Sequence, residues 1–289
     1  MKKFLTGCCV LLFLLSCGNR KLKMDPFDAI TSLVDTAAWN ARQDTLVSDS
    51  LSIKDEGPHW VEADELFDDF IFNYATDTIF QRQRTIFPLP YYKGDTPLKI
   101  TQEQWKHDSL FAGQTCYTLL FDREEDMDLV GDTNLSSVQV EWIFLHQRKV
   151  KRYYFQRTKG GVWMLEAMNL RDMEESDGNE NFVTFYERFA TDSVYEGEHI
   201  HEPLQFITID PDDEFSILET TLDCARWFTF RPTLPTDKLS NINYGQRNED
   251  LSTTKILKVN GVSNGYSNIL YFRKRKGEWE LYKYEDSSM

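Results

Sequence analysis

The side chains best suited to acid–base chemistry or ligand binding lie near residue 105. Trp105, His107 and Asp108 occur within one short stretch, and Tyr117 follows soon after. A histidine and a carboxylate beside aromatic rings can bind a small ligand or take a proton from it. With Trp142 from a later strand, these residues form the predicted ligand-binding site, with no catalytic residue assigned. Neighbouring side chains on a strand point to opposite faces, however, so His107 and Asp108 would diverge. The alternative is that Trp105 is a core residue and the polar pair is solvated.

Sequence patterns of common enzymes and metal sites are absent. The chain has no Gly-x-Ser-x-Gly elbow, no His-Glu-x-x-His, no Gly-rich phosphate loop and no Cys-x-x-Cys. Two acidic stretches, 122–132 and 210–214, offer oxygens that Ca²⁺ would accept, but their spacing does not fit an EF-hand. His199 and His201 would share one face of a strand without a third ligand. We therefore predict no metal, no cofactor and a protein without enzymatic activity.

The amino terminus carries the most specific chemical signal. Two lysines precede an apolar run over 4–15, which is shorter than the roughly 20 residues that span a bilayer. The run ends in Leu14-Leu15-Ser16-Cys17, which resembles a bacterial lipobox, where the thiol accepts diacylglycerol. We predict a signal peptide over 1–16, lipid attachment at Cys17 and a lipidated tether over 17–56. The alternative is an ordinary secretory signal with an incidental cysteine.

Charge and location limit the partners. The chain has 32 Lys and Arg against 47 Asp and Glu, a formal net charge of −15, which argues against binding nucleic acid. The expected partners are the membrane, through the lipid on Cys17, and either a small molecule or an envelope protein. The predicted location is the outer membrane. The periplasmic face is favoured because basic residues, not acidic ones, follow Cys17. The oligomeric state and any pairing of Cys116 with Cys224 stay open.

An internal repeat organises the remaining chain. A shift of 115 residues places 67–89 on 182–204 without a gap, including Phe70 on Phe185. A second match joins 155–165 to 272–281, where a Lys-Gly turn is followed by a tryptophan. We expect Gly160 or Gly161, and Gly277, to occupy these turns, and Trp163 and Trp279 to lie on equivalent faces.

The periodicity of the repeat predicts an α+β fold. Each half opens with an amphipathic helix, and a short second helix must stop before Pro88 or Pro203. Over 138–144 apolar and polar residues alternate, which is typical of a strand. With one hairpin near the end of each half, this pattern predicts a curved antiparallel sheet. Residues 171–179 would link two tandem domains over 57–172 and 176–289. The apolar stretch 215–230 is expected to pack inside the second.

Several motifs carry a family resemblance. Two helices followed by a curved sheet resemble the cone-shaped nuclear-transport-factor-2-like fold. The motifs are similar to those of the domain-of-unknown-function 4348 family of envelope lipoproteins, over nearly everything after residue 60. They include Phe67-Asp-Asp-Phe70, Phe87-Pro-Leu-Pro-Tyr-Tyr92, Trp105-Lys-His-Asp108 and Asp210-Pro-Asp-Asp213. The resemblance implies a cone fold and an envelope location, and it supplies no activity or catalytic residue.

Three functions follow from these observations. The leading hypothesis is a non-enzymatic lipoprotein with two cones that binds a small molecule or an envelope partner. The alternatives are an enzyme with a proton-transfer site inside the first cone, and a structural spacer. A buried ionisable pair with room for substrate would favour the enzyme. An interior filled by the protein's own side chains would favour binding or scaffolding.

The lipid anchor gives the first testable prediction. Replacing Cys17 by Ala removes the only thiol placed to accept diacylglycerol, so lipid labelling should be abolished and the precursor should stay uncleaved or mislocalised. Labelling with radioactive palmitate and cell fractionation measure both effects. Incorporation of the label into the Cys17→Ala protein would show that the lipobox interpretation is wrong.

Overall fold

The computed structural model describes residues 66–173, 180–246 and 252–289. The predicted signal peptide 1–16, the attachment residue Cys17 and the tether 17–56 lie outside the described residues. In the described part, no helix has the length and apolar character to cross a membrane.

Each half of the described chain begins with two helices, and an aspartate starts the second. Asp77 Oδ1 accepts hydrogen bonds from the backbone of Ile79 and Phe80 at 2.7 and 2.9 Å. Asp192 Oδ1 caps the equivalent helix through Val194 and Tyr195. The described helices are α3 (Phe67–Thr76), α4 (Thr78–Gln83), α5 (Glu180–Thr191), α6 (Ser193–Glu198) and α7 (Cys224–Phe230), with 3₁₀ turns η1 (Leu110–Gly113) and η2 (Glu124–Gly131).

Within the described residues, twelve strands follow the same order in the two halves. The first half contains β1 (Leu89–Lys93), β2 (Thr96–Ile100), β3 (Cys116–Phe121), β4 (Ser137–Phe144), β5 (Lys149–Arg157) and β6 (Trp163–Asp172). The second half contains β7 (Ile200–Asp210), β8 (Asp213–Leu222), β9 (Lys238–Asn243), β10 (Thr254–Gly261), β11 (Ser267–Arg275) and β12 (Glu278–Asp286). The helices and strands confirm an α+β fold.

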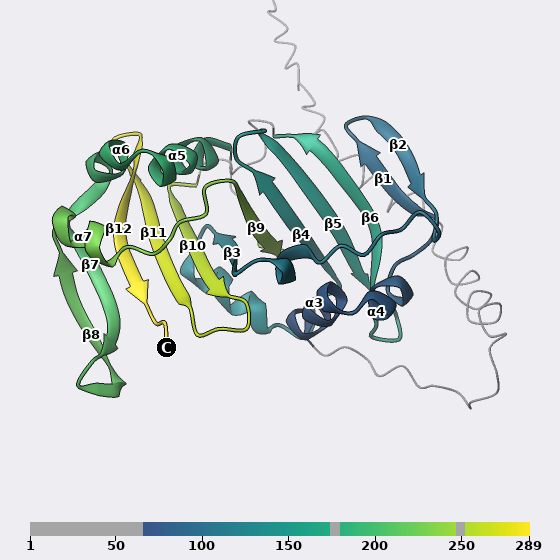
Figure 1. The fold of residues 1–289 in the computed structure, drawn as a ribbon, viewed down its shortest axis with the longest axis horizontal. Coiled ribbons are helices and arrows are strands. Elements are labelled where there is room, and N and C mark those ends of the chain that lie inside the picture. The colour runs from purple at the N-terminus through teal and green to yellow at the C-terminus, as the bar shows by residue number, and fades with distance from the viewer. Residues whose placement is uncertain (1–65, 174–179, 247–251) are drawn as a thin grey trace, which may run out of the picture. The chain divides into compact units, whose positions relative to one another are not determined.

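The two halves exchange one strand each (Figure 1). One sheet has the order β2-β1-β6-β5-β4-β9, and we call it sheet A. The other has the order β3-β10-β11-β12-β7-β8, and we call it sheet B. Strand β3 of the first half therefore pairs with β10, and β9 of the second half pairs with β4.

The exchanged strands face each other, and side chains join their backbones. Ser240 Oγ accepts from the backbone N–H of Thr118 at 2.7 Å and donates to its carbonyl at 3.0 Å. Thr118 Oγ1 donates to the carbonyl of Ser240. The backbone N–H of Leu120 donates to Asn241 Oδ1 at 2.9 Å. These bonds satisfy the backbone groups of two strands that end their sheets in the interior, where unpaired groups would be costly. We call Thr118, Leu120, Ser240 and Asn241 the seam.

Aromatic side chains fill the interior in the same way in both halves. The ring of Phe67 meets that of Trp163 edge-on at 5.0 Å, and Phe182 meets Trp279 at 5.3 Å. Phe70 and Phe185 are both buried on the first helix of their halves. Such edge-to-face contacts add to the stabilisation from burial. The two tryptophans therefore occupy equivalent positions, as the repeat predicts.

The turns of the repeated hairpins also match the prediction. Gly161 and Gly277 have φ angles of 82° and 90°, in the left-handed region that glycine adopts without a steric penalty. They lie between β5 and β6 and between β11 and β12.

Two expectations of the sequence need correction or remain open. The described residues form one compact unit, and each sheet takes a strand from the other half, so two independent tandem domains are not confirmed. The boundaries 57–172 and 176–289 stay predictions. The stretch 215–230 does not simply pack inward, because Phe215 is 90% exposed and Phe230 is 54% exposed.

The strand exchange predicts that the halves cannot separate after the chain is cut. A protease site inserted within 174–179 should be cleaved to give two fragments that stay together, because β3 and β9 hold each half to the other's sheet. Size-exclusion chromatography with and without denaturant measures the association. Separation of the fragments under native conditions would contradict the exchanged strand order.

Candidate functional site

Asp108 lies at the centre of the most connected polar cluster near the predicted site. Its Oδ1 accepts from the backbone N–H of Leu110 at 3.1 Å, and its Oδ2 accepts from Lys151 Nζ at 3.0 Å. The hydroxyl of Tyr153 donates a short hydrogen bond to the same Oδ2. Strand β5 places Lys151 and Tyr153 on one face, because they are two residues apart. Both carboxylate oxygens are therefore engaged.

The backbone around Asp108 is fixed by a buried glutamine. Gln81 on α4 donates to the carbonyls of Asp108 and Tyr74, both at 2.8 Å, and accepts from the Asp108 N–H at 2.9 Å. Its repeat equivalent, Glu196 on α6, accepts from Trp227 Nε1 at 2.9 Å and is paired with Arg231. Both side chains are fully buried, with exposures of 0 and 1%. Each half thus uses one position of its short helix to hold the segment after its second strand.

Electrostatics favour an ionised Asp108 and a protonated Tyr153 near neutral pH. Burial alone would raise the pKa of Asp108, but Lys151 and the hydrogen bonds from Tyr153 and Leu110 outweigh it and lower the pKa. Burial, and then the charge of Asp108, raise the pKa of Tyr153 far above its ordinary value. Burial likewise raises the pKa of Tyr74. An ionised acid with both oxygens bonded and a phenol that retains its proton are poor groups for proton transfer at pH 7.

The structure brings only some of the predicted site residues together. Trp142 is buried and pairs across the strands with Lys151, which links it to Asp108. Lys238 Nζ lies 4.2 Å from the centroid of the Trp142 ring. Trp105 is half-buried, with its ring 6.0 Å from that of Phe87.

The other two predicted residues point elsewhere. His107 is exposed. Tyr117 lies on β3 in sheet B, where its ring stacks on Phe111 at 5.0 Å and its hydroxyl accepts from Asn260 at 3.2 Å. Sequence reasoning missed Gln81, Lys151 and Tyr153. The 115-residue shift, which pairs Gln81 with Glu196, is a signal that could have identified Gln81.

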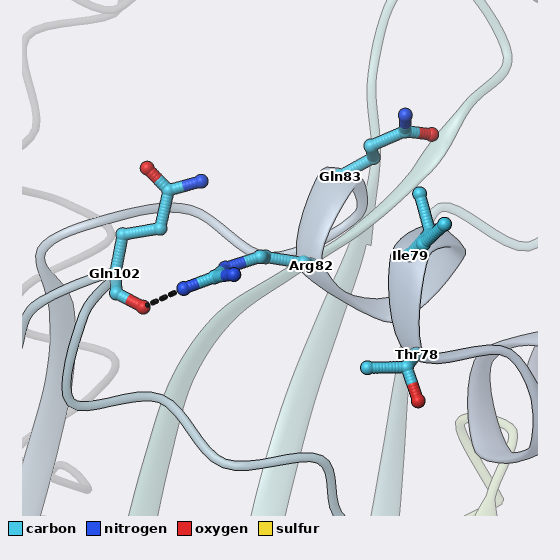
Figure 2. Close-up of a pocket in the computed structure, with 5 residues that line it drawn as sticks. All are labelled: Thr78, Ile79, Arg82, Gln83 and Gln102. Carbon is cyan, nitrogen blue, oxygen red and sulfur yellow. Dashed lines mark hydrogen bonds between the residues drawn. The ribbon is translucent and has the colours of Figure 1, made fainter.

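A surface pocket of about 320 Å³ is lined by residues of α4 and by Gln102, and its lining does not include Asp108, Lys151 or Tyr153. Figure 2 shows its lining residues, Thr78, Ile79, Arg82, Gln83 and Gln102. The guanidinium of Arg82 is directed at the carbonyl of Gln102 and donates to it at 2.7 Å. The lining includes no carboxylate, histidine or cysteine and none of the predicted site residues, so it offers no general base to activate the hydroxyl of Thr78.

The candidate metal ligands and thiols are separated. Among the described residues, no group of three or more His, Cys, Asp or Glu side chains is placed to hold a metal ion. His199 ends α6 whereas His201 lies in β7, so the two do not share a strand as expected. Cys116 and Cys224 are both free thiols.

The bonds of Asp108 predict a pH-dependent contribution to stability. Replacing Asp108 by Asn should lower the free energy of unfolding at pH 7 by about 1–3 kcal/mol, because charged hydrogen bonds are lost. The pKa of Asp108 is lowered from its ordinary 3.8, so its contribution is complete above that value and disappears as the pH falls through the folded-state pKa.

Urea unfolding at pH 7 and in steps down to pH 3 measures this difference. The exposed carboxylate Asp95 supplies the control, and Asp95→Asn should change stability little. An equal loss in both variants, or a difference for Asp108→Asn that grows as the pH falls, would contradict the assigned role.

Known proteins place this architecture in a family. A solved NTF2-like protein from Bacteroides fragilis NCTC 9343 is 62% identical to this chain, with a TM-score of 0.75, and the match covers 80% of this chain and 100% of that one. No curated protein matches the chain. The model "Domain of unknown function (DUF4348)" matches residues 43–286. The chain therefore belongs to the DUF4348 family, and its mixed α+β fold is NTF2-like.

Proposed function

We propose that the protein is a non-enzymatic envelope lipoprotein, anchored through Cys17 to the periplasmic face of the outer membrane, that binds a partner protein on its surface. The observation that carries this proposal is that the protein's own side chains fill the interior. Phe67, Phe70, Phe155 and Trp163 are each about 1% exposed and contact one another through their rings. They occupy the face between α3 and sheet A where a small ligand would otherwise enter.

The second half supports the same conclusion. Phe182, Phe185, Phe272 and Trp279 form the equivalent ring cluster between α5 and sheet B. Interiors packed with interdigitated rings leave little space for a small molecule. A binding function then favours an exposed surface, and hence a macromolecular partner over a small molecule.

The enzyme alternative finds little support in the polar groups. The ionisable cluster nearest to the predicted site is Asp108 with Lys151 and Tyr153, and its members bond to one another. Because a general base needs a free lone pair directed at substrate, this cluster suits a structural role better. The side chain of His107, which precedes Asp108 in the chain, is exposed and is not one of the groups that bond to the Asp108 carboxylate.

A structural spacer is the second candidate, and one observation favours it. The exchanged strands and the seam join the halves into one unit, which would resist bending between them. A spacer and a binding protein differ in whether a specific partner touches the described surface.

The test uses the full chain in the cells that produce it. A photo-crosslinking amino acid is placed at each of four exposed positions, Ile79, Leu98, Val194 and Ile217. The proposal predicts a discrete protein adduct from at least one position, seen on denaturing gels. It also predicts that a small-molecule library gives the purified protein no saturable thermal stabilisation.

Each contrary result selects an alternative. The absence of adducts at all four positions would favour the spacer. Saturable stabilisation by a small molecule without adducts would favour a ligand-binding protein. Turnover of any compound would overturn the non-enzyme proposal.

A further inference from the structure

The large apolar side chains that the described residues expose are concentrated around β8 and α7. Phe215 is 90% exposed, Ile217 71%, Leu218 39%, Phe228 37% and Phe230 54%. Ile217 and Leu218 are adjacent on β8, so they point to opposite faces of the sheet. The edge is therefore apolar on both faces. Large apolar side chains that stay exposed in one part of a protein indicate a candidate interaction site.

The first half provides an internal comparison, because its β1–β2 hairpin is the repeat equivalent of β7–β8. Strand β2 ends sheet A, spans five residues and contains Pro97 and Lys99. Proline and lysine are the residues that natural proteins place on an edge strand to prevent pairing with another chain. The edge strand β2 of the first half is thus protected against pairing with a strand of another chain.

Strand β8 ends sheet B without these protections. It runs from Asp213 to Leu222 and contains neither proline nor lysine. The register shifts near the hairpin tip, where Phe215 lies, and regular pairing with β7 then continues from Ile217 to Leu222. Within the described chain, no strand pairs with the outer edge of this regular segment. Its backbone donors and acceptors can therefore accept a further strand.

The charge around this edge defines the partner. The hairpin 200–222 contains six Asp and Glu residues and no Lys or Arg. Glu219 is exposed and shares a face with Ile217, while Asp210, Asp212 and Asp213 gather at the tip. An added strand with apolar residues opposite Ile217 and Leu218 and cations opposite Glu219 and the tip would be complementary.

A second copy of this chain fits less well. If two β8 strands paired, two acidic hairpins would be brought together, and like charges across strands are destabilising. If β8 paired with β2 of another copy, Pro97 would lack the backbone N–H needed for a ladder bond. Neither of the described sheet edges of a second copy supplies a cationic, unprotected strand.

We propose that β8 is a docking edge at which an extended, cationic and apolar segment of another protein adds to sheet B as a further strand. This inference rests on the proposed binding function and names its surface and the chemistry of its partner. Main-chain hydrogen bonds along β8 would supply affinity, and the alternating apolar and cationic side chains would supply specificity.

A peptide designed from β8 tests the chemistry directly. The probe is the capped peptide Thr-Thr-Lys-Val-Ile-Lys-Lys, which in antiparallel register places Lys opposite Glu219 and Val and Ile opposite Leu218 and Ile217. The control peptide has Glu in place of each Lys. We expect the full chain to bind the first peptide, more weakly as salt is raised, and not the second.

Two protein variants locate the site. Ile217→Lys puts a cation on the exposed edge and should weaken peptide binding by about tenfold or more. Leu98→Lys makes the same change on the other edge strand and should leave binding unchanged. Both positions are exposed, so both variants should fold, which far-ultraviolet circular dichroism checks. Hydrogen exchange should show that the peptide protects those alternate amides within 217–222 that point away from β7.

The outcomes separate this inference from the proposed function. Equal peptide binding by both variants, binding of the Glu peptide, or protection elsewhere than β8 would overturn the docking edge. In cells, photo-crosslinked adducts from position 98 but not from 217 would overturn the edge and leave the binding function standing. An adduct with the mass of two copies of this chain at 217 would replace the foreign partner with self-association and overturn the proposal.

Discussion

Hydrogen bonds from side chains to backbone across the seam are the constraint on which the rest of the structure depends. Each sheet ends in the interior with an exchanged strand, and such a strand would normally bury a row of unpaired backbone groups. Ser240 and Asn241 supply partners for Thr118 and Leu120, so two sheet edges can lie side by side without a continuous ladder. Asn241 in turn donates to the buried Glu141 at 2.9 Å.

Buried ionic groups extend this network on either side of the seam. Glu141 accepts from Arg152 across β4 and β5, and Asp122, just after β3, pairs with Lys255 on β10. All four residues are less than a tenth exposed. Removing one partner of a buried pair leaves an uncompensated charge, which costs far more than the intact pair contributes. Each pair joins two neighbouring strands, so the loss of one partner would leave a buried charge between them.

The sequence predicted the local elements and the equivalent positions, because both depend on nearby residues. Helix starts at Asp77 and Asp192 and the glycine turns follow from capping and backbone preference. The exchange of β3 and β9 was not predictable, because alternation of apolar and polar residues identifies a strand but not the strand with which it pairs. Asp108 was selected for its type, yet Lys151 and Tyr153 lie 43 and 45 residues further along, where no spacing rule connects them to it.

The exchange also explains how two halves of one repeat can differ in function. It fixes β3 and β9 in the interior, so the free edges, β2 and β8, lie at the opposite ends of their sheets. Residues at these ends can change without disturbing the seam or the aromatic clusters. In the first half, Pro97 and Lys99 close the edge, whereas in the second Ile217 and Leu218 leave it apolar and open. The packed interior is the same in both halves, whereas residues of the outer edge strands can vary and determine which partner binds, because surface substitutions cost little stability.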